Sequence, residues 1–67
     1  MNTALFKYCT TRAGFSLAKL ADVLGINPAT LYRKMTGESD FTRAEMTLIK
    51  ECLDLTFEEV EKIFFTD

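Results

Sequence analysis

One short predicted helix carries an arginine and an alanine one turn apart on its outer face. Leu31 and Met35 give this helix its inward face. Ala29 and Arg33 then point the opposite way, with Tyr32 on one flank. An arginine guanidinium pairs bidentately with O6 and N7 of guanine, and an alanine methyl packs on the methyl of thymine. These residue types at this spacing suit the reading of base edges in a DNA groove.

Polar side chains around the same helix suit the DNA backbone. Asn27, Thr30 and Lys34 stand where they can reach phosphates, which fix the register of a protein on DNA without reading its sequence. Each basic residue also has a plainer interpretation as solvated surface. Tyr32 fits equally well as cover for the edge of the core. The residues alone leave these alternatives open.

Catalytic chemistry finds little support elsewhere in the chain. There is no histidine, so the usual imidazole base and metal ligand are missing. Cys9 and Cys52 are far apart and form no CxxC pair, which favours two reduced, buried thiols. The acidic run at 58–61 has no partner ligands and suits the first turn of a helix. We expect no enzyme activity, no metal, no cofactor and no small-molecule substrate.

Length and composition predict one small soluble domain over residues 1–67. Of the 67 residues, 48% are hydrophobic, which is too apolar for a disordered peptide. Neither a signal sequence nor a membrane span is expected, so the predicted location is cytoplasmic. The net charge of −2 is unevenly divided, because residues 1–43 carry six bases and three acids whereas residues 44–67 carry two bases and seven acids. This division predicts one basic and one acidic face.

Cap signals divide the chain into five short helices and predict an all-α bundle. The capping side chains are Asn2 or Thr3, Ser16, Asn27, Thr42 and Thr56. The predicted helices run from the first cap to about residue 13, over 17–24, over 28–35, and onward from residues 42 and 56. Glutamates three residues after the last two caps complete capping boxes. The expected inward residues are Leu5, Phe6, Cys9, Leu17, Leu20, Ala21, Leu24, Leu31, Met35, Met46, Ile49, Cys52, Leu53, Phe57, Val60 and Phe64.

Residues 16–37 have the pattern of a helix-turn-helix. The turn 25–27 is too short for an ordinary antiparallel hairpin of helices. Gly25 supplies the sharp bend, Ile26 plugs the turn, and Ala21 is small where the second helix must approach closely. Such a motif holds its second helix outward for the major groove.

The run 17–35 resembles the helix-turn-helix of phage Cro and lambda-type repressors. The matching positions are Leu20, Ala21, Leu24, Gly25, Ile26 and Leu31. One departure is Lys34, which stands where the family usually has an apolar residue. The resemblance implies a Cro-like phage repressor in a bacterial host, bound as a homodimer to a palindromic double-stranded DNA operator and blocking a promoter.

The resemblance also implies further backbone contacts. At the start of the second helix these are Ser16 and the Leu17 amide, and after the recognition helix they are Ser39, Thr42 and Arg43. Glu38 and Asp40 oppose this assignment because carboxylates repel phosphates, unless they pair with Arg43 or point away.

Two adjacent aromatics near the C-terminus fit either a wide core or a dimer contact. Phe64 shares the inward stripe of its helix, whereas Phe65 lies off its edge. The acidic overall charge also keeps a second function open, in which the fold is a helical interaction module that binds another regulator, as an antirepressor does. Salt-sensitive DNA binding would discriminate between the two.

Overall fold

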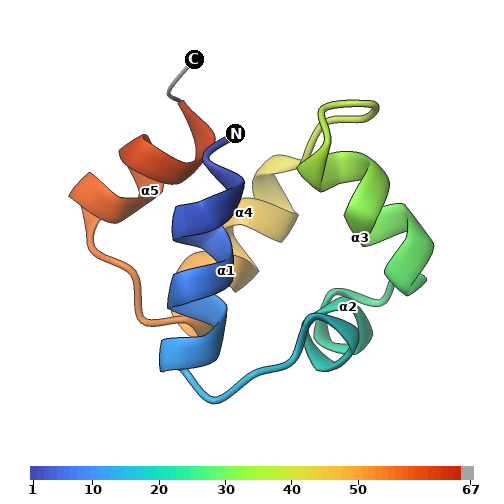
Figure 1. Ribbon diagram of the computed structural model, residues 1–67, viewed down its shortest axis with the longest axis horizontal. Coiled ribbons are helices and arrows are strands. Elements are labelled where there is room, and N and C mark those ends of the chain that lie inside the picture. Colours follow the sequence, from blue (N-terminus) through green and yellow to red (C-terminus); the bar gives the residue numbers. More distant parts are fainter. Residues whose placement is uncertain (66–67) are drawn as a thin grey trace.

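Five α-helices form where the cap signals place them. A computed structural model describes residues 1–65, with helices at Thr3–Arg12 (α1), Leu17–Leu24 (α2), Pro28–Met35 (α3), Arg43–Cys52 (α4) and Phe57–Phe64 (α5) (Figure 1). This described part contains no β-strand. The predicted all-α fold is therefore confirmed.

Each helix begins at a side chain that accepts a hydrogen bond from an amide of its first turn. The cap of α1 is Asn2, whose Oδ1 accepts from the amide of Leu5 at 3.1 Å. Both predicted capping boxes are complete: Thr42 and Glu45 cap α4, and Thr56 and Glu59 cap α5. Because an N-cap is worth about 1 kcal/mol, five of them stabilise helices too short to persist alone.

A residue with left-handed φ follows each of the first four helices. Gly25 closes α2 at φ 72° and ψ 27°, a conformation that costs glycine little. After α4 the left-handed residue is Asp54, one residue beyond the C-cap Leu53, at φ 51°, where its Cβ is disfavoured. The amide of Leu55 then donates to the carbonyl of Lys50 at 2.9 Å, which completes the turn.

One buried cluster joins the five helices. Its members have at most 4% of their surface exposed: Phe6, Cys9, Leu20, Ala21, Leu31, Met35, Ile49, Leu53, Leu55 and Ile63. Three rings extend it, with the Phe41 and Phe64 centroids 5.3 Å apart and Phe6 within 6.4 Å of both. In Figure 1, α1 packs beside α5, and α2 and α3 lie together on the opposite side.

The inward face of α5 differs from the prediction. Phe57 was expected to face inward, but its side chain is 81% exposed, and Ile63 is fully buried instead. Ile63 belongs to the buried cluster, and α5 packs against α1. The amide of Asn2, just before α1, also donates to the Ile63 carbonyl at 2.8 Å. Phe57 instead lies under the ammonium of Lys50, 5.3 Å from the ring centroid.

The two cysteines are free thiols, and only one of them is fully buried. Cys9 has no exposed surface, whereas Cys52 is half-buried. Burial raises the pKa of the Cys9 thiol, and Arg12 nearby opposes this effect without cancelling it. Cys9 therefore remains a neutral apolar side chain of the core.

Candidate nucleic-acid interface

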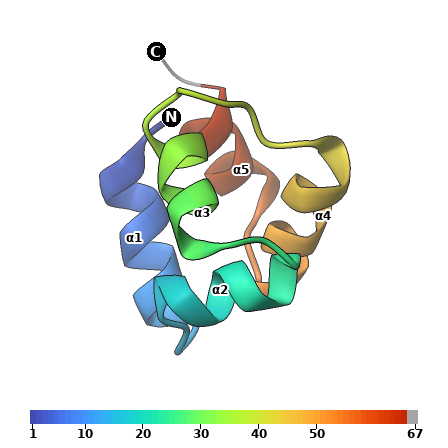
Figure 2. The ribbon, with the colours of Figure 1, turned by 90° about the vertical axis from the view of Figure 1, so that its right-hand side faces the viewer.

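The turn between α2 and α3 positions the candidate surface. Gly25 reverses the chain, and the amide of Ile26 donates to the carbonyl of Ala21 at 3.0 Å. Ala21 is fully buried where α3 packs on α2, and Ile26 covers the same contact. As a result, α3 crosses α2 and forms part of one outer side of the molecule (Figure 2). The predicted geometry of the turn is confirmed.

The outer face of α3 carries all three residues that were predicted to contact bases. Ala29 and Arg33 are exposed, and 51% of Tyr32 is accessible. Leu31 and Met35 fill the inward side, as expected from the 100° projection. The helix therefore presents a small methyl, a guanidinium and a phenol to one region of solvent.

The guanidinium of Arg33 forms a hydrogen bond within its own helix and, among the described residues, no ion pair with an acid. Its Nη2 donates to Thr30 Oγ1 at 3.2 Å. Its carbonyl accepts from the hydroxyl of Thr36 at 3.0 Å and from the amide of Glu38 at 2.9 Å. No ion pair between described residues involves Arg33. The guanidinium keeps its charge available for an anion or a base edge.

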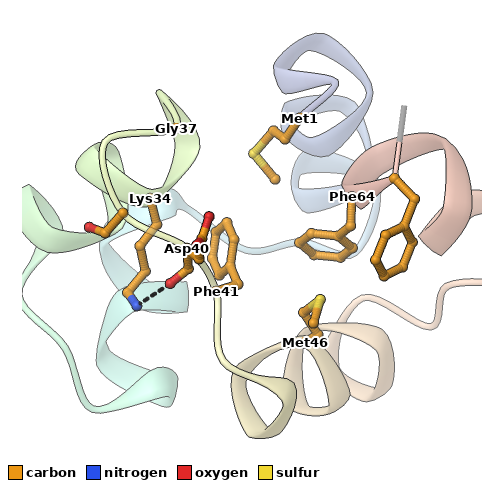
Figure 3. Close-up of a pocket in the computed structure, with 9 residues that line it drawn as sticks. Met1, Lys34, Gly37, Asp40, Phe41, Met46 and Phe64 are labelled. Atoms are coloured by element: carbon orange, nitrogen blue, oxygen red, sulfur yellow. Dashed lines mark hydrogen bonds between the residues drawn. The ribbon is translucent and has the colours of Figure 1, made fainter. Parts of the chain in front are cut away.

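Lys34 does not occupy the position expected of a phosphate contact. Its ammonium donates to the carbonyl of Asp40 and to Glu45 Oε1, each at 2.9 Å, and only 11% of its side chain is exposed. Figure 3 shows it directed to the loop before α4, beside the ring of Phe41. The aliphatic part of the Lys34 side chain thus lies at the edge of the core, and its ammonium is paired with Glu45 inside the domain.

Glu45 holds the Lys34 ammonium in this position. The sequence identified Glu45 only as part of the capping box of α4. Burial opposes its ionisation, but hydrogen bonds from the Thr42 amide and from Lys34 outweigh burial and lower its pKa. The carboxylate and the ammonium lie eleven residues apart on different helices. A local sequence pattern gives no signal for such a pair.

The remaining predicted backbone contacts lie at exposed helix starts and in the loop 36–42. The side-chain oxygens of Ser16, Asn27 and Thr42 accept from amides of their own helices. Ser39 is exposed in the loop, while Leu17 is half-buried at the start of α2. The caps are therefore confirmed, and their phosphate roles stay predictions.

Charge around this surface is mixed. Arg43 is exposed at the start of α4, and within residues 1–65 it forms no ion pair with Glu38 or Asp40. Both acids are themselves exposed in the loop. Because Lys34 is paired with Glu45, Arg33 is the one cation of α3 that no ion pair between described residues engages.

The arrangement defines an all-α domain with a helix-turn-helix whose second helix faces outward. Residues 11–36 match the model of the bacterial regulatory protein, Fis family. The match covers less than half of the chain, and it is a similarity to a bacterial helix-turn-helix regulatory family over the region of the helix-turn-helix. It does not single out the Cro and lambda-repressor type. The searches of curated proteins and of solved structures found no match.

The helices of the described residues are all too short or too polar to span a bilayer.

Proposed function

We propose that this protein is a sequence-specific regulator of transcription that inserts α3 into the major groove of double-stranded DNA. Arg33 is the principal reader and pairs with a guanine, Ala29 contacts a thymine methyl, and Tyr32 reaches a neighbouring base. The observation that carries the proposal is the exposed guanidinium of Arg33, free of any acid in the described structure, on the second helix of a helix-turn-helix.

Backbone contacts hold that helix in place. We assign them to the start of α2 and to the loop and helix start after α3, namely Ser16, the Leu17 amide, Asn27, Ser39, Thr42 and Arg43. Lys34 is left out because its ammonium is already bound by Asp40 and Glu45. We therefore expect a shallow salt dependence of binding, with only a few phosphates neutralised.

The finer part of the proposal is a Cro-like phage repressor, acting as a dimer in the bacterial cytoplasm. Two copies would occupy a palindromic operator with half-sites about one helical turn apart and block a promoter. Support for a contact surface comes from α5 and its end, where Phe57 and Phe65 are 81% and 68% exposed. Phe64, also expected there, packs against Phe41 in the core and is not available.

Sedimentation of the wild type and of Phe65→Ser tests the dimer. We expect a wild-type dimer, at least in the presence of operator DNA, that Phe65→Ser weakens. A monomer on every duplex would exclude dimeric binding, and a Phe65→Ser dimer of unchanged strength would exclude this surface.

Selection from random duplex DNA, followed by fluorescence anisotropy across salt concentrations, tests DNA reading. Arg33→Ala should cost about 1–3 kcal/mol on the selected duplex and relax selectivity at one base pair. Lys7→Ala is the matched control, since Lys7 is an exposed base on α1. We expect it to leave affinity and selectivity unchanged.

Two other results would change the assignment. An equal loss on every duplex would make Arg33 a phosphate contact only. No wild-type binding, even at low salt, would exclude the DNA function and favour a protein partner. The mixed charge around α3 makes that second outcome a real alternative.

A further inference from the structure

Thr30 lies beside Arg33, the residue proposed to read a base, and is in contact with it. Its hydroxyl accepts the 3.2 Å hydrogen bond from Arg33 Nη2, one turn further along α3. Thr30 is half-buried, whereas Arg33 is exposed. The threonine is thus the more fixed partner of the two, since a β-branched side chain in a helix has few rotamers.

The main chain of Arg33 is fixed as well. Its carbonyl accepts from the Thr36 hydroxyl at 3.0 Å and from the amides of Glu38 and Ser39 at 2.9 and 3.3 Å. The residues that follow α3 therefore hold the backbone of Arg33, and Thr30 holds its guanidinium. Both ends of a long and flexible side chain are restrained before any ligand binds.

This restraint leaves the guanidinium able to bind. A guanidinium has five N–H donors, and a bidentate pair with guanine uses two of them. Thr30 takes one donor of Nη2, and no acid in the described chain takes another. Restraining a side chain in one orientation lowers the entropy that it loses on binding.

We infer that Thr30 is a positioning residue, which orients Arg33 toward its base and sets selectivity at that base pair. This inference rests on the proposed DNA reading by α3. It is a different role from the phosphate contact expected of Thr30, since the hydroxyl acts here as an acceptor toward Arg33 and its own O–H could still donate to a phosphate. A phosphate contact would act on all sequences alike, whereas a positioning residue acts only through the side chain that it holds.

A double-mutant cycle separates these two roles. The proteins are wild type, Thr30→Val, Thr30→Ser, Arg33→Ala and the combined Thr30→Val/Arg33→Ala. Each is titrated with the duplex selected by the wild type and with the same duplex changed at the base pair where Arg33→Ala relaxes selectivity. Circular dichroism and thermal melts confirm that each protein is folded at the assay temperature.

Thr30→Val should lower discrimination between the two duplexes by about two- to tenfold, the range expected for one hydrogen bond. Thr30→Ser, which keeps the hydroxyl, should retain most of it. In the Arg33→Ala background, Thr30→Val should have no further effect, because the side chain that it positions is gone.

The opposite pattern would overturn the inference. If Thr30→Val weakens both duplexes equally and adds to Arg33→Ala, Thr30 is a phosphate contact, and the salt slope should then stay unchanged because a neutral hydroxyl releases no counterion. If Thr30→Val leaves discrimination unchanged, the hydrogen bond has no role in reading. If the wild type binds no duplex, the proposed function fails and this inference fails with it, a result distinct from the other two.

Discussion

Arg12 of α1 donates two hydrogen bonds to Glu59 of α5, from Nη1 at 2.8 Å and from Nη2 at 3.1 Å. The same carboxylate accepts from the amide of Thr56 at 3.0 Å and so completes the capping box of its own helix. One glutamate therefore starts α5 and fixes α5 against α1. A bidentate pair gives directional restraint that a single contact lacks.

Glu45 repeats this device on the other side of the molecule. Its Oε1 accepts from the Thr42 amide at 2.8 Å, which caps α4, and from Lys34 of α3 at 2.9 Å. Both capping-box glutamates thus bind a cation from another helix. The short helices of this small chain are joined at their caps as well as through the apolar core.

The ion pair of Glu59 with Arg12 should make the free energy of unfolding decrease at low pH. The Arg12 hydrogen bonds, with that from the Thr56 amide, lower the pKa of Glu59 from 4.5 to about 2. Below pH 4.5 the unfolded chain binds a proton that the folded chain resists, so the stabilisation is complete above this pH. It is lost as the pH falls toward about 2.

Urea unfolding of wild type and Glu59→Gln between pH 7 and pH 2 measures this effect. The variant should be less stable at pH 7 and should show a flatter decline on acidification. Glu58→Gln is the matched control, since Glu58 lies in the same first turn and pairs with Lys62 at the surface. If Glu58→Gln flattens the profile as much as Glu59→Gln does, the cap pair is not the cause.

Lys34→Met should affect stability and not DNA binding. Methionine keeps the apolar stem but leaves Glu45 without its cation, so we expect the free energy of unfolding to fall by about 1–3 kcal/mol. Lys19→Met, which removes an exposed 3.8 Å pair with Asp22, should cost less than about 0.5 kcal/mol. Chemical unfolding measures the stabilities and anisotropy the affinities. Weaker DNA binding by folded Lys34→Met would restore Lys34 as a backbone contact.

The features that the sequence predicted well are local ones. A cap and its amide lie within three residues, so Ser16 and Thr42 could be identified from residue type and spacing. The bend at Gly25 is equally local, and together these placed all five helices. The outward face of α3 followed because Leu31 and Met35 mark its buried side without ambiguity.

The features that it missed depend on contacts between distant segments. In α5 both Phe57 and Ile63 are apolar, and only the packing of the helix against the rest of the domain decides that Ile63 is buried and Phe57 exposed. Lys34 likewise has the residue type of an exposed base, and only the folded chain brings Glu45 of another helix to its ammonium. A pattern within one helix cannot reveal a partner on another.

Gly25→Ala should destabilise the domain through the backbone alone. A Cβ at this position would meet nothing within 4 Å, so no clash contributes. The left-handed conformation at φ 72° should cost alanine about 1–2 kcal/mol. Thermal unfolding measures the loss, and Ala18→Gly at the exposed second residue of α2 gives a reference for the helix itself. An unchanged Gly25→Ala melting temperature would mean that the turn adapts to a different conformation.

Asp54→Gly should stabilise the domain by about 0.5–1 kcal/mol, for two separable reasons. Asp54 holds a left-handed φ of 51° that glycine adopts without strain, and its carboxylate lies at the negative end of the α4 dipole. Asp54→Asn removes the charge and keeps the Cβ, so it should recover only the electrostatic part. Asp54→Ala removes the charge but tolerates this conformation poorly. Urea unfolding should therefore rank glycine above asparagine and asparagine above alanine. Equal stability of the glycine and asparagine variants would show that charge, and not backbone strain, is the cost at this position.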